Sequence, residues 1–170
     1  MQTDAFTTAA RRLFDEIAVM TLATCTDAVP WATDVYFAPD GFDLVFLSSP
    51  RSRHSRNLAS NPACAATIHP LVKSWREIRG LQIEGEVQPP TGTVAKARAL
   101  AAYLSKFPFA RDLIAHPAET AGAFANATLQ VLRPSRLRYL DNAVGIGKRW
   151  SLCLIDGQAV GPPELEAREQ

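Results

Sequence analysis

The chain has 170 residues, which is enough for one domain with a core of its own. Its apolar content of 47%, charged content of 21% and net charge of +1 are those of an ordinary globular protein, and they exclude a chain-wide basic field that would recruit nucleic acid or an acidic membrane. Because no apolar run reaches the ~20 residues of a membrane-spanning helix and the N-terminus lacks a signal-peptide layout, we expect a cytoplasmic protein.

The first part of the sequence predicts a helix followed by three antiparallel strands. Apolar side chains recur at helical spacing near the N-terminus, which indicates an amphipathic helix lying on an apolar surface. The next runs have the composition of strands, and short turns separate them. A meander of this kind usually curls into a barrel or a sandwich. The predicted elements are a helix at 4–17 and strands at 19–25, 31–38 and 43–49.

The stretch at 42–61 joins the third strand to a short basic helix. The strand surfaces at Ser48 and Ser49, and Ser52 is placed to cap a helix whose first turn carries Arg53 and His54. A helix start presents free N–H groups and partial positive charge, and arginine adds forked, charged hydrogen bonds. The pattern therefore predicts a phosphate site, and the alternative is a solvated basic helix after an ordinary strand.

The rest of the chain completes an α+β fold with six to eight antiparallel strands and peripheral helices, for which we favour a barrel over a sandwich. Gly80 and Gly85 interrupt the fifth strand, and glycine there often marks a bulge, a barrel bend or a ligand close to the backbone. The stretch at 116–125 looks mobile and the tail at 161–170 looks frayed. Further strands are expected at 63–69, 77–87, 128–132, 136–140 and 149–155, with a helix at 92–105 whose apolar stripe is Val94, Ala97, Ala101 and Leu104.

Other chemistries find less support in the sequence. The three cysteines have neither a zinc-ligand spacing nor a disulfide pattern, so we expect Cys25, Cys64 and Cys153 to be buried packing residues. Glu84 and Glu86 share a strand face, which is more typical of a solvated sheet surface than of an acid–base pair. Aromatic residues make up 8% of the chain, too few for a single-stranded nucleic-acid groove. His69 and His116 stand in no recognisable constellation.

Several motifs together resemble one protein family. They are L-A-T at 22–24, P-W-A-T-D-V-Y-F-A at 30–38, L-V-F-L-S-S-P-R-S-R-H-S-R-N-L at 44–58 and I-R-G-L-Q-I-E-G-E at 78–86. In this order they resemble the FMN-binding split β-barrel of the pyridoxamine 5′-phosphate oxidase-related superfamily. The segments at 107–111 and 140–150 are similar to those of a small bacterial branch of it. The resemblance implies a single antiparallel split barrel of Greek-key type over residues 1–170.

The resemblance also implies a site. The end of the third strand and the basic helix would hold the FMN phosphate, and the strand at 32–35 would give main-chain bonds to the isoalloxazine. A homodimer with FMN in a groove between its subunits is implied, with the loop at 148–150 of the second chain near the ring. The implied cofactor-binding residues are Ala32, Thr33, Asp34, Val35, Ser48, Ser49, Arg53, His54, Asn57, Gly80, Gln82, Lys148 and Trp150.

The implied function is that of an FMN-dependent oxidoreductase acting on a small molecule, with no nucleic-acid or membrane partner. His54 replaces the lysine that follows the S-R pair in the true oxidases, and this departure argues against pyridoxamine phosphate as the substrate. Lys148 is the candidate for a cation that stabilises the reduced flavin. Two alternatives stay open: a deazaflavin-dependent reductase, and a non-catalytic flavin- or haem-binding module with His54, His69 or His116 as the axial ligand.

Overall fold

The architecture is that of a computed structural model, which describes residues 1–115 and 126–166. The N-terminal half contains α1 (Thr3–Glu16), β1 (Val19–Thr26), β2 (Val29–Asp40), β3 (Asp43–Ser48), α2 (Arg53–Ser60) and β4 (Ala63–Ile68). The remainder contains η1 (Trp75–Glu77), β5 (Arg79–Gln88), α3 (Gly92–Lys106), α4 (Ala110–Ala115), β6 (Thr128–Asp141), β7 (Arg149–Ile155) and β8 (Gln158–Leu165).

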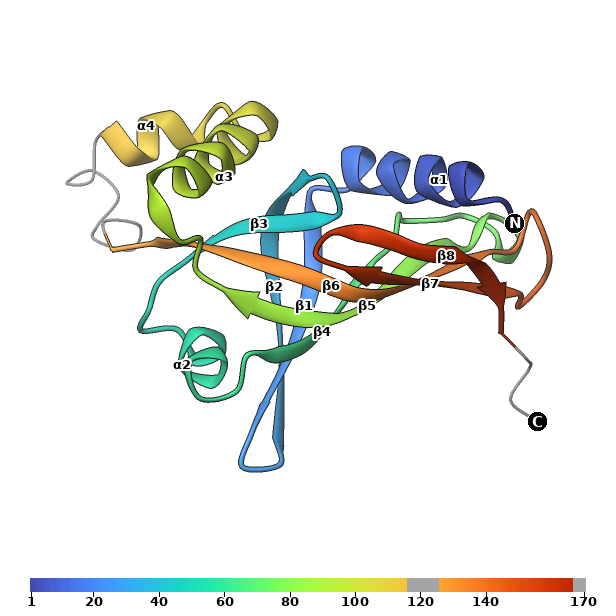
Figure 1. Ribbon diagram of the computed structural model, residues 1–170, viewed down its shortest axis with the longest axis horizontal. Helices are drawn as coiled ribbons and strands as arrows, with labels where there is room; N and C mark the ends of the chain where they lie inside the picture. Colours follow the sequence, from blue (N-terminus) through green and yellow to red (C-terminus); the bar gives the residue numbers. More distant parts are fainter. Residues whose placement is uncertain (116–125, 167–170) are drawn as a thin grey trace.

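The strands form one antiparallel sheet that closes on itself. Over the described residues its order is β3-β2-β1-β4-β5-β6-β7-β8, and an additional pairing of β3 with β6 closes a six-stranded barrel (Figure 1). β7 and β8 extend the sheet beyond the closure. The predicted α+β split barrel is therefore confirmed.

The barrel is split along β2, which extends beyond its pairing with β3. β3 lies between two strands, and its residues 43–46 pair with β2 at 37–40 while its residues 44–48 pair with β6. β1 accompanies β2 over the whole range 29–36. Within the described parts of the chain, the other edge of 29–36 has no strand partner, so its backbone N–H and C=O groups are available to another partner.

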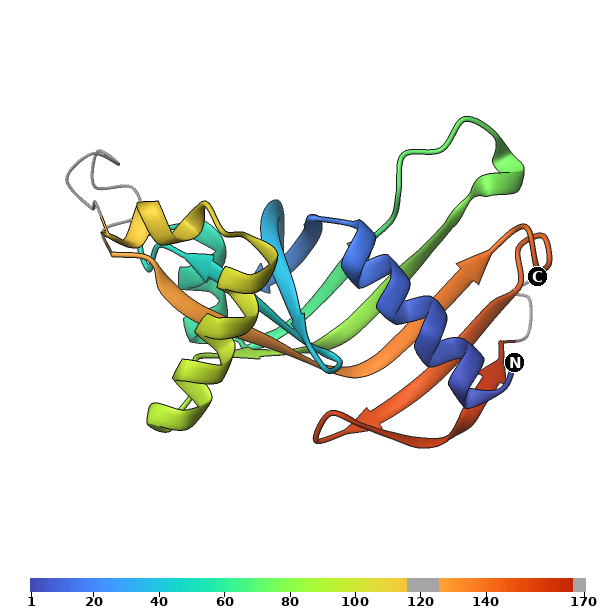
Figure 2. The same cartoon turned by 90° about the horizontal axis from the view of Figure 1, so that it is seen from above.

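The core fills the barrel and the space beneath α1. α1 runs diagonally across the strands (Figure 2), and its apolar face is fully buried. Phe6 packs edge-on against Tyr139 at a centroid distance of 6.1 Å, and Phe14 packs against Phe37 at 6.2 Å. The helix predicted at 4–17 is thus confirmed, with its apolar stripe facing the barrel as expected.

The apolar stripe expected on the second helix is wrong at three of its four positions, and only Leu104 packs, partly buried, against the neighbouring core. α3 occupies the predicted range, but Val94 is 83% exposed and Ala97 and Ala101 are also exposed. The buried stripe consists of Ala99 and Tyr103, which pack on β2 and β3. Alanine is compatible with either face of a helix, so composition could not select the contacting stripe.

The end of the chain also differs from expectation. The two strands expected at 128–132 and 136–140 are one strand, β6, because Ser135 forms a bulge where the register shifts between Glu84 and Gly85, with Pro134 opposite Gly85. The frayed tail is wrong for 161–165, which belong to β8 and pair with β7. Cys153 is exposed and Cys25 and Cys64 are half-buried, so the expectation of three buried cysteines is also wrong. The stretch at 116–125 and residues 167–170 lie outside the described residues.

Among the described residues, none of the helices combines the length and apolarity that crossing a membrane would require.

Candidate functional site

The candidate site begins at the end of β3. Ser48 is the last residue of this strand and is 94% buried, because it pairs with Thr128 of β6. After a turn at 49–52, Ser52 caps α2 and accepts a hydrogen bond from the Ser55 N–H at 3.3 Å. The capping role that the sequence predicted for Ser52 is confirmed.

Four side chains meet at this helix start. The Ser48 Oγ lies 3.1 Å from the Ser52 Oγ, 2.8 Å from the Ser55 Oγ and 2.5 Å from His54 Nε2. Ser52 also contacts His54 Nε2 at 3.1 Å and donates to the Ser55 Oγ at 2.9 Å. Three hydroxyls and one imidazole thus form a polar cluster, which we call the serine–histidine cluster (Ser48, Ser52, His54, Ser55).

The imidazole in this cluster is neutral near neutral pH. Partial burial lowers the pKa of His54 from its ordinary value of 6.5, because desolvation penalises the imidazolium form. A neutral imidazole can donate one hydrogen bond and accept another, which suits it to a hydroxyl network. An anion bound at the cluster would favour its protonated form.

Arginines surround the cluster from outside. The Arg53 guanidinium lies over the ring of Trp31 at 4.4 Å from the centroid, and Trp31 belongs to the split part of β2. Arg56 donates to the backbone oxygen of Arg51. All three arginines are exposed, so their charge is available to a ligand approaching the start of α2.

Two asparagines hold α2 in position. The Asn57 Nδ2 donates to the Thr24 Oγ1 at 3.0 Å, and the Asn61 Nδ2 donates to the backbone oxygen of Cys25 at 3.1 Å. Asn57 therefore ties the helix to β1 through Thr24.

The strand segment expected beside the flavin lies at the split. Ala32 and Asp34 are exposed, Thr33 is half-buried, and Val35 belongs to the core. Asp34 accepts a hydrogen bond from the Thr21 Oγ1 at 2.7 Å, so its side chain is held on β1. A ligand could therefore bind the backbone N–H and C=O groups on the unpaired edge of this segment.

The other expected residues lie elsewhere in the chain. Gly80 and Gln82 belong to β5, which is three strands from β2 in the sheet order. A Cβ on Gly80 would lie 2.8 Å from the backbone oxygen of Ile68, so packing within this chain already requires glycine there. Gln82 is exposed, as is Lys148 in the β6–β7 loop, whereas Trp150 is 92% buried in the core.

Sequence reasoning missed part of the cluster. Ser55 was not singled out, Ser52 was expected only as a cap, and Trp31 was not expected to contact Arg53. The signal was the i, i+3 spacing of Ser52 and Ser55 in the first helical turn, which puts both hydroxyls on one side. Serine at a helix start is so often a cap that this spacing alone does not indicate a site.

The arrangement suits an oxyanion with several oxygens. The N–H groups of Arg53 and His54 belong to the first helical turn, where no preceding carbonyl can accept them. Together with three hydroxyls and the partial positive charge of the helix start, they form a donor set for phosphate. Although Ser48 contacts His54, its burial argues against a nucleophile that attacks a substrate.

Similarity to known proteins identifies the family of this chain. Over residues 6–141 the chain matches the family described as pyridoxamine 5′-phosphate oxidase. It belongs to this family. Members of the pyridoxamine 5′-phosphate oxidase family commonly bind flavin, and the fold is typically dimeric. The resemblance inferred from the motifs is thereby confirmed.

Several individual proteins are similar to this chain in sequence or in fold. A UPF0306 protein, YhbP, from Salmonella arizonae is 28% identical over 147 residues, which are 84% of this chain and 91% of the relative. A haem-binding protein from Mycobacterium smegmatis has a TM-score of 0.70 at 28% identity over 85% of this chain. This chain spans 56% of that protein's length. An FAD-binding protein from Mesorhizobium loti shares the fold, with a TM-score of 0.58 and 13% identity over 75% of this chain and 86% of its own.

Proposed function

We propose that the protein is an FMN-binding flavoprotein that transfers hydride or electrons between its cofactor and a small molecule. The observation that carries the proposal is the serine–histidine cluster at the start of α2, which lies next to the unpaired edge of β2. The serine–histidine cluster would bind the phosphate of FMN. The unpaired edge of β2 would bind the hydrogen-bonding edge of its flavin ring. Membership in the pyridoxamine 5′-phosphate oxidase family supports the same cofactor class.

The phosphate end of the cofactor is assigned to residues around α2. The Ser48, Ser52 and Ser55 hydroxyls and the free N–H groups of the first turn would bind its oxygens, with Ser49 at the rim. Arg53 would leave the ring of Trp31 and add a charged hydrogen bond. Asn57 would keep α2 fixed against β1, so the donors hold their geometry.

The ring end is assigned to the split. FMN, when bound, supplies the two-electron chemistry of its isoalloxazine. The backbone at 32–35 would orient the ring through N–H and C=O groups that have no strand partner among the described residues. Gly80, Gln82 and Lys148 would reach a ring only from a second subunit, where Lys148 would place positive charge near the pyrimidine. The side chain of Trp150 packs in the core and is left out of the proposed site.

Titration with FMN and with riboflavin tests the proposal. Because riboflavin lacks the phosphate, we expect it to bind at least about 100-fold more weakly, as for two lost charge-assisted hydrogen bonds of about 1.5 kcal/mol each. Arg53→Ala should weaken FMN binding by about 1.5–3 kcal/mol and leave riboflavin binding nearly unchanged. Arg98→Ala, which removes an exposed arginine paired with Asp40, is the matched control. Equal affinity for the two flavins would refute the phosphate site.

Titrations of the same protein also test two other cofactors, haem and a deazaflavin. Haem is favoured by the likeness to the haem-binding protein from Mycobacterium smegmatis. His54 is engaged with Ser48, whereas His69 is exposed and contacts the Pro70 oxygen through Nδ1, which leaves Nε2 free to bind iron. Titration with hemin should then give a Soret band that His69→Ala removes. A deazaflavin would bind through the same phosphate site and lack the visible flavin spectrum.

A further inference from the structure

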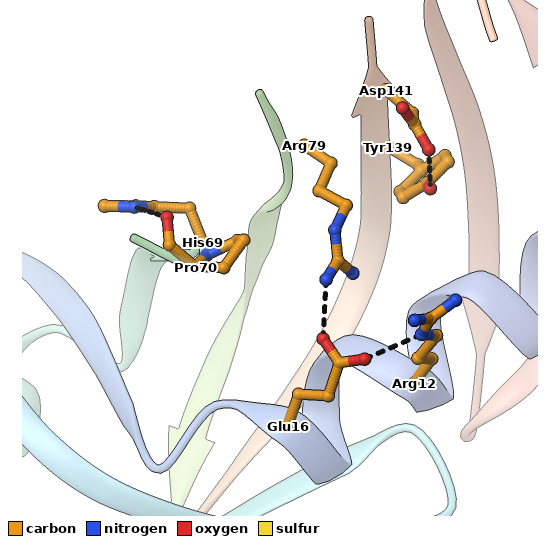
Figure 3. A network of polar contacts seen from close by, with 7 residues as sticks. All are labelled: Arg12, Glu16, His69, Pro70, Arg79, Tyr139 and Asp141. Carbon is orange, nitrogen blue, oxygen red and sulfur yellow. Dashed lines mark hydrogen bonds and ion pairs between the residues drawn. The ribbon is translucent and has the colours of Figure 1, made fainter. Parts of the chain in front are cut away.

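A cavity lies between α1 and the edge formed by η1, β5 and β6, apart from the serine–histidine cluster. Its volume is about 720 Å³, within the range of about 300–1,000 Å³ typical of small-molecule sites. Figure 3 shows its polar network, in which Glu16 lies between Arg12 and Arg79 while Tyr139 and Asp141 occupy the neighbouring strand. None of the residues assigned to the cofactor lines this cavity.

The acceptors around this cavity are largely satisfied by the protein. The Asp141 carboxylate accepts the Tyr139 hydroxyl at 2.8 Å and the Ala143 N–H at 2.9 Å. Glu77 accepts the N–H of Lys73 at 3.2 Å. Burial, followed by the hydrogen bond to Asp141, raises the pKa of Tyr139, so this phenol stays neutral and adds no negative charge.

The arginines of the cavity, in contrast, have N–H groups that are not used in hydrogen bonds with the described residues. Arg12 pairs with Glu16 through Nε at 2.6 Å, and Arg79 pairs with the same carboxylate through Nη2 at 2.7 Å. Each guanidinium carries five N–H donors, so both retain unused ones. Arg76, also on the wall, rests on the ring of Trp75 at 4.5 Å. Three guanidinium groups therefore line this cavity together with three carboxylates, and two of those carboxylates, Glu77 and Asp141, already accept hydrogen bonds from the protein.

The floor of the cavity is apolar. Ala5 and Ala9 on α1 and the ring of Tyr139 supply it. A ligand that fits both features carries an oxyanion at one end and a compact apolar body at the other. We propose that this cavity binds a small organic anion, with its charged group between Arg12, Arg76 and Arg79 and its apolar body against α1. The proposal is independent of the cofactor site.

An NMR titration of the flavin-treated, 170-residue protein tests this proposal. The probes are benzoate and phenyl phosphate, with benzyl alcohol as the neutral analogue of similar shape. We expect benzoate or phenyl phosphate to shift the backbone amide signals of Thr8, Ala9 and Ala143, and benzyl alcohol to bind at least roughly tenfold more weakly. Preference between the two anions distinguishes a carboxylate ligand from a phosphate ligand.

Substitutions of single arginines test whether the anion binds in this cavity. Arg12→Met and Arg79→Met should each raise the dissociation constant by roughly tenfold, as for one lost charged contact. Arg98→Met, another exposed and ion-paired arginine, should leave it unchanged. Arg53→Ala should also leave it unchanged, which separates this cavity from the α2 site. Equal binding of benzyl alcohol, unaltered binding in both variants, or amide shifts confined to α2 would each overturn the proposal.

Discussion

His54 connects the stability of the protein to pH through its partial burial. Burial lowers the pKa of His54 in the folded protein, whereas in the unfolded chain it returns to its ordinary value of about 6.5. Between these two values the unfolded chain binds a proton that the folded protein does not. The free energy of unfolding therefore rises with pH in this window and falls as the solution is acidified below about 6.5.

The prediction is that His54→Gln removes part of this slope. Urea unfolding between about pH 5 and 7.5 should show wild-type stability declining toward acid more steeply than that of the variant. His69→Gln, which changes an exposed histidine, should retain the wild-type slope. Parallel slopes for wild type and His54→Gln would show that the imidazole titrates equally in both states.

At the scale of elements, a bulge at Ser135 lets β6 continue past Pro134, which lies opposite Gly85 of β5. A Cβ on Gly85 would lie 2.3 Å from the backbone oxygen of Arg133, and backbone on both strands cannot yield easily. Gly85→Ala should therefore destabilise the protein by about 1–3 kcal/mol or more, measured by urea unfolding. Gly145→Ala is the control, because its new Cβ would meet the flexible side chain of Lys148. A neutral Gly85→Ala would mean that the bulge can relax.

Lys106 joins the end of α3 to the end of α1. Its Nζ donates to the backbone oxygens of Phe14 and Ile17, each at 2.6 Å, and lies 3.9 Å from the centre of the Phe37 ring. Lys106→Met should cost about 1.5–3 kcal/mol, because carbonyls at the C-terminus of α1 lose a charged donor. Lys96→Met, on an exposed position of the same helix, should cost little in the same thermal or urea unfolding experiment. An equal loss of unfolding free energy in the two variants would contradict this prediction and would show that the lysine-to-methionine change itself, through helix propensity, causes the loss.

The sequence predicted elements better than it predicted their contacts. Period-2 runs and turn residues located the strands through β5, and Ser52 located the start of α2. The continuity of β6 could not be foreseen, because it depends on the register shift against β5 beside Pro134. The strand β8 was missed because Gly161 and two prolines disfavour a strand, and its pairing with β7 decides the outcome.

The candidate site shows the same limit. Ser48, Ser52 and His54 are close in sequence, so local pattern brought them together. The contact of Arg53 with Trp31 and the anchoring of Asn57 on Thr24 join residues far apart in the chain, and these depend on how the split hairpin of β1 and β2 lies beside α2. Trp150 shows a related limit, since a tryptophan next to two cations can point either outward or into the core, and here it is buried.

At the scale of the whole molecule, one outer face of the barrel is suited to contact with a second copy. Ala23 pairs directly with Ala32 of β2 and with Ala65 of β4, and paired residues project from the same side of a sheet. All three are exposed and small, so another surface can approach the strands closely. The fold is typically dimeric, which agrees with such a face.

The last prediction is that this face forms a homodimer and that the dimer completes the flavin site. Light scattering should give about twice the chain mass of 18.5 kDa. Ala23→Arg should halve the measured mass and weaken FMN binding together, because a long cation blocks close approach and Gly80, Gln82 and Lys148 of a second subunit are then lost from the ring. Ala101→Arg, on the exposed side of α3, should change neither quantity. Tight FMN binding by a wild-type monomer would instead show that the α2 cluster and the β2 edge of one chain hold the cofactor alone.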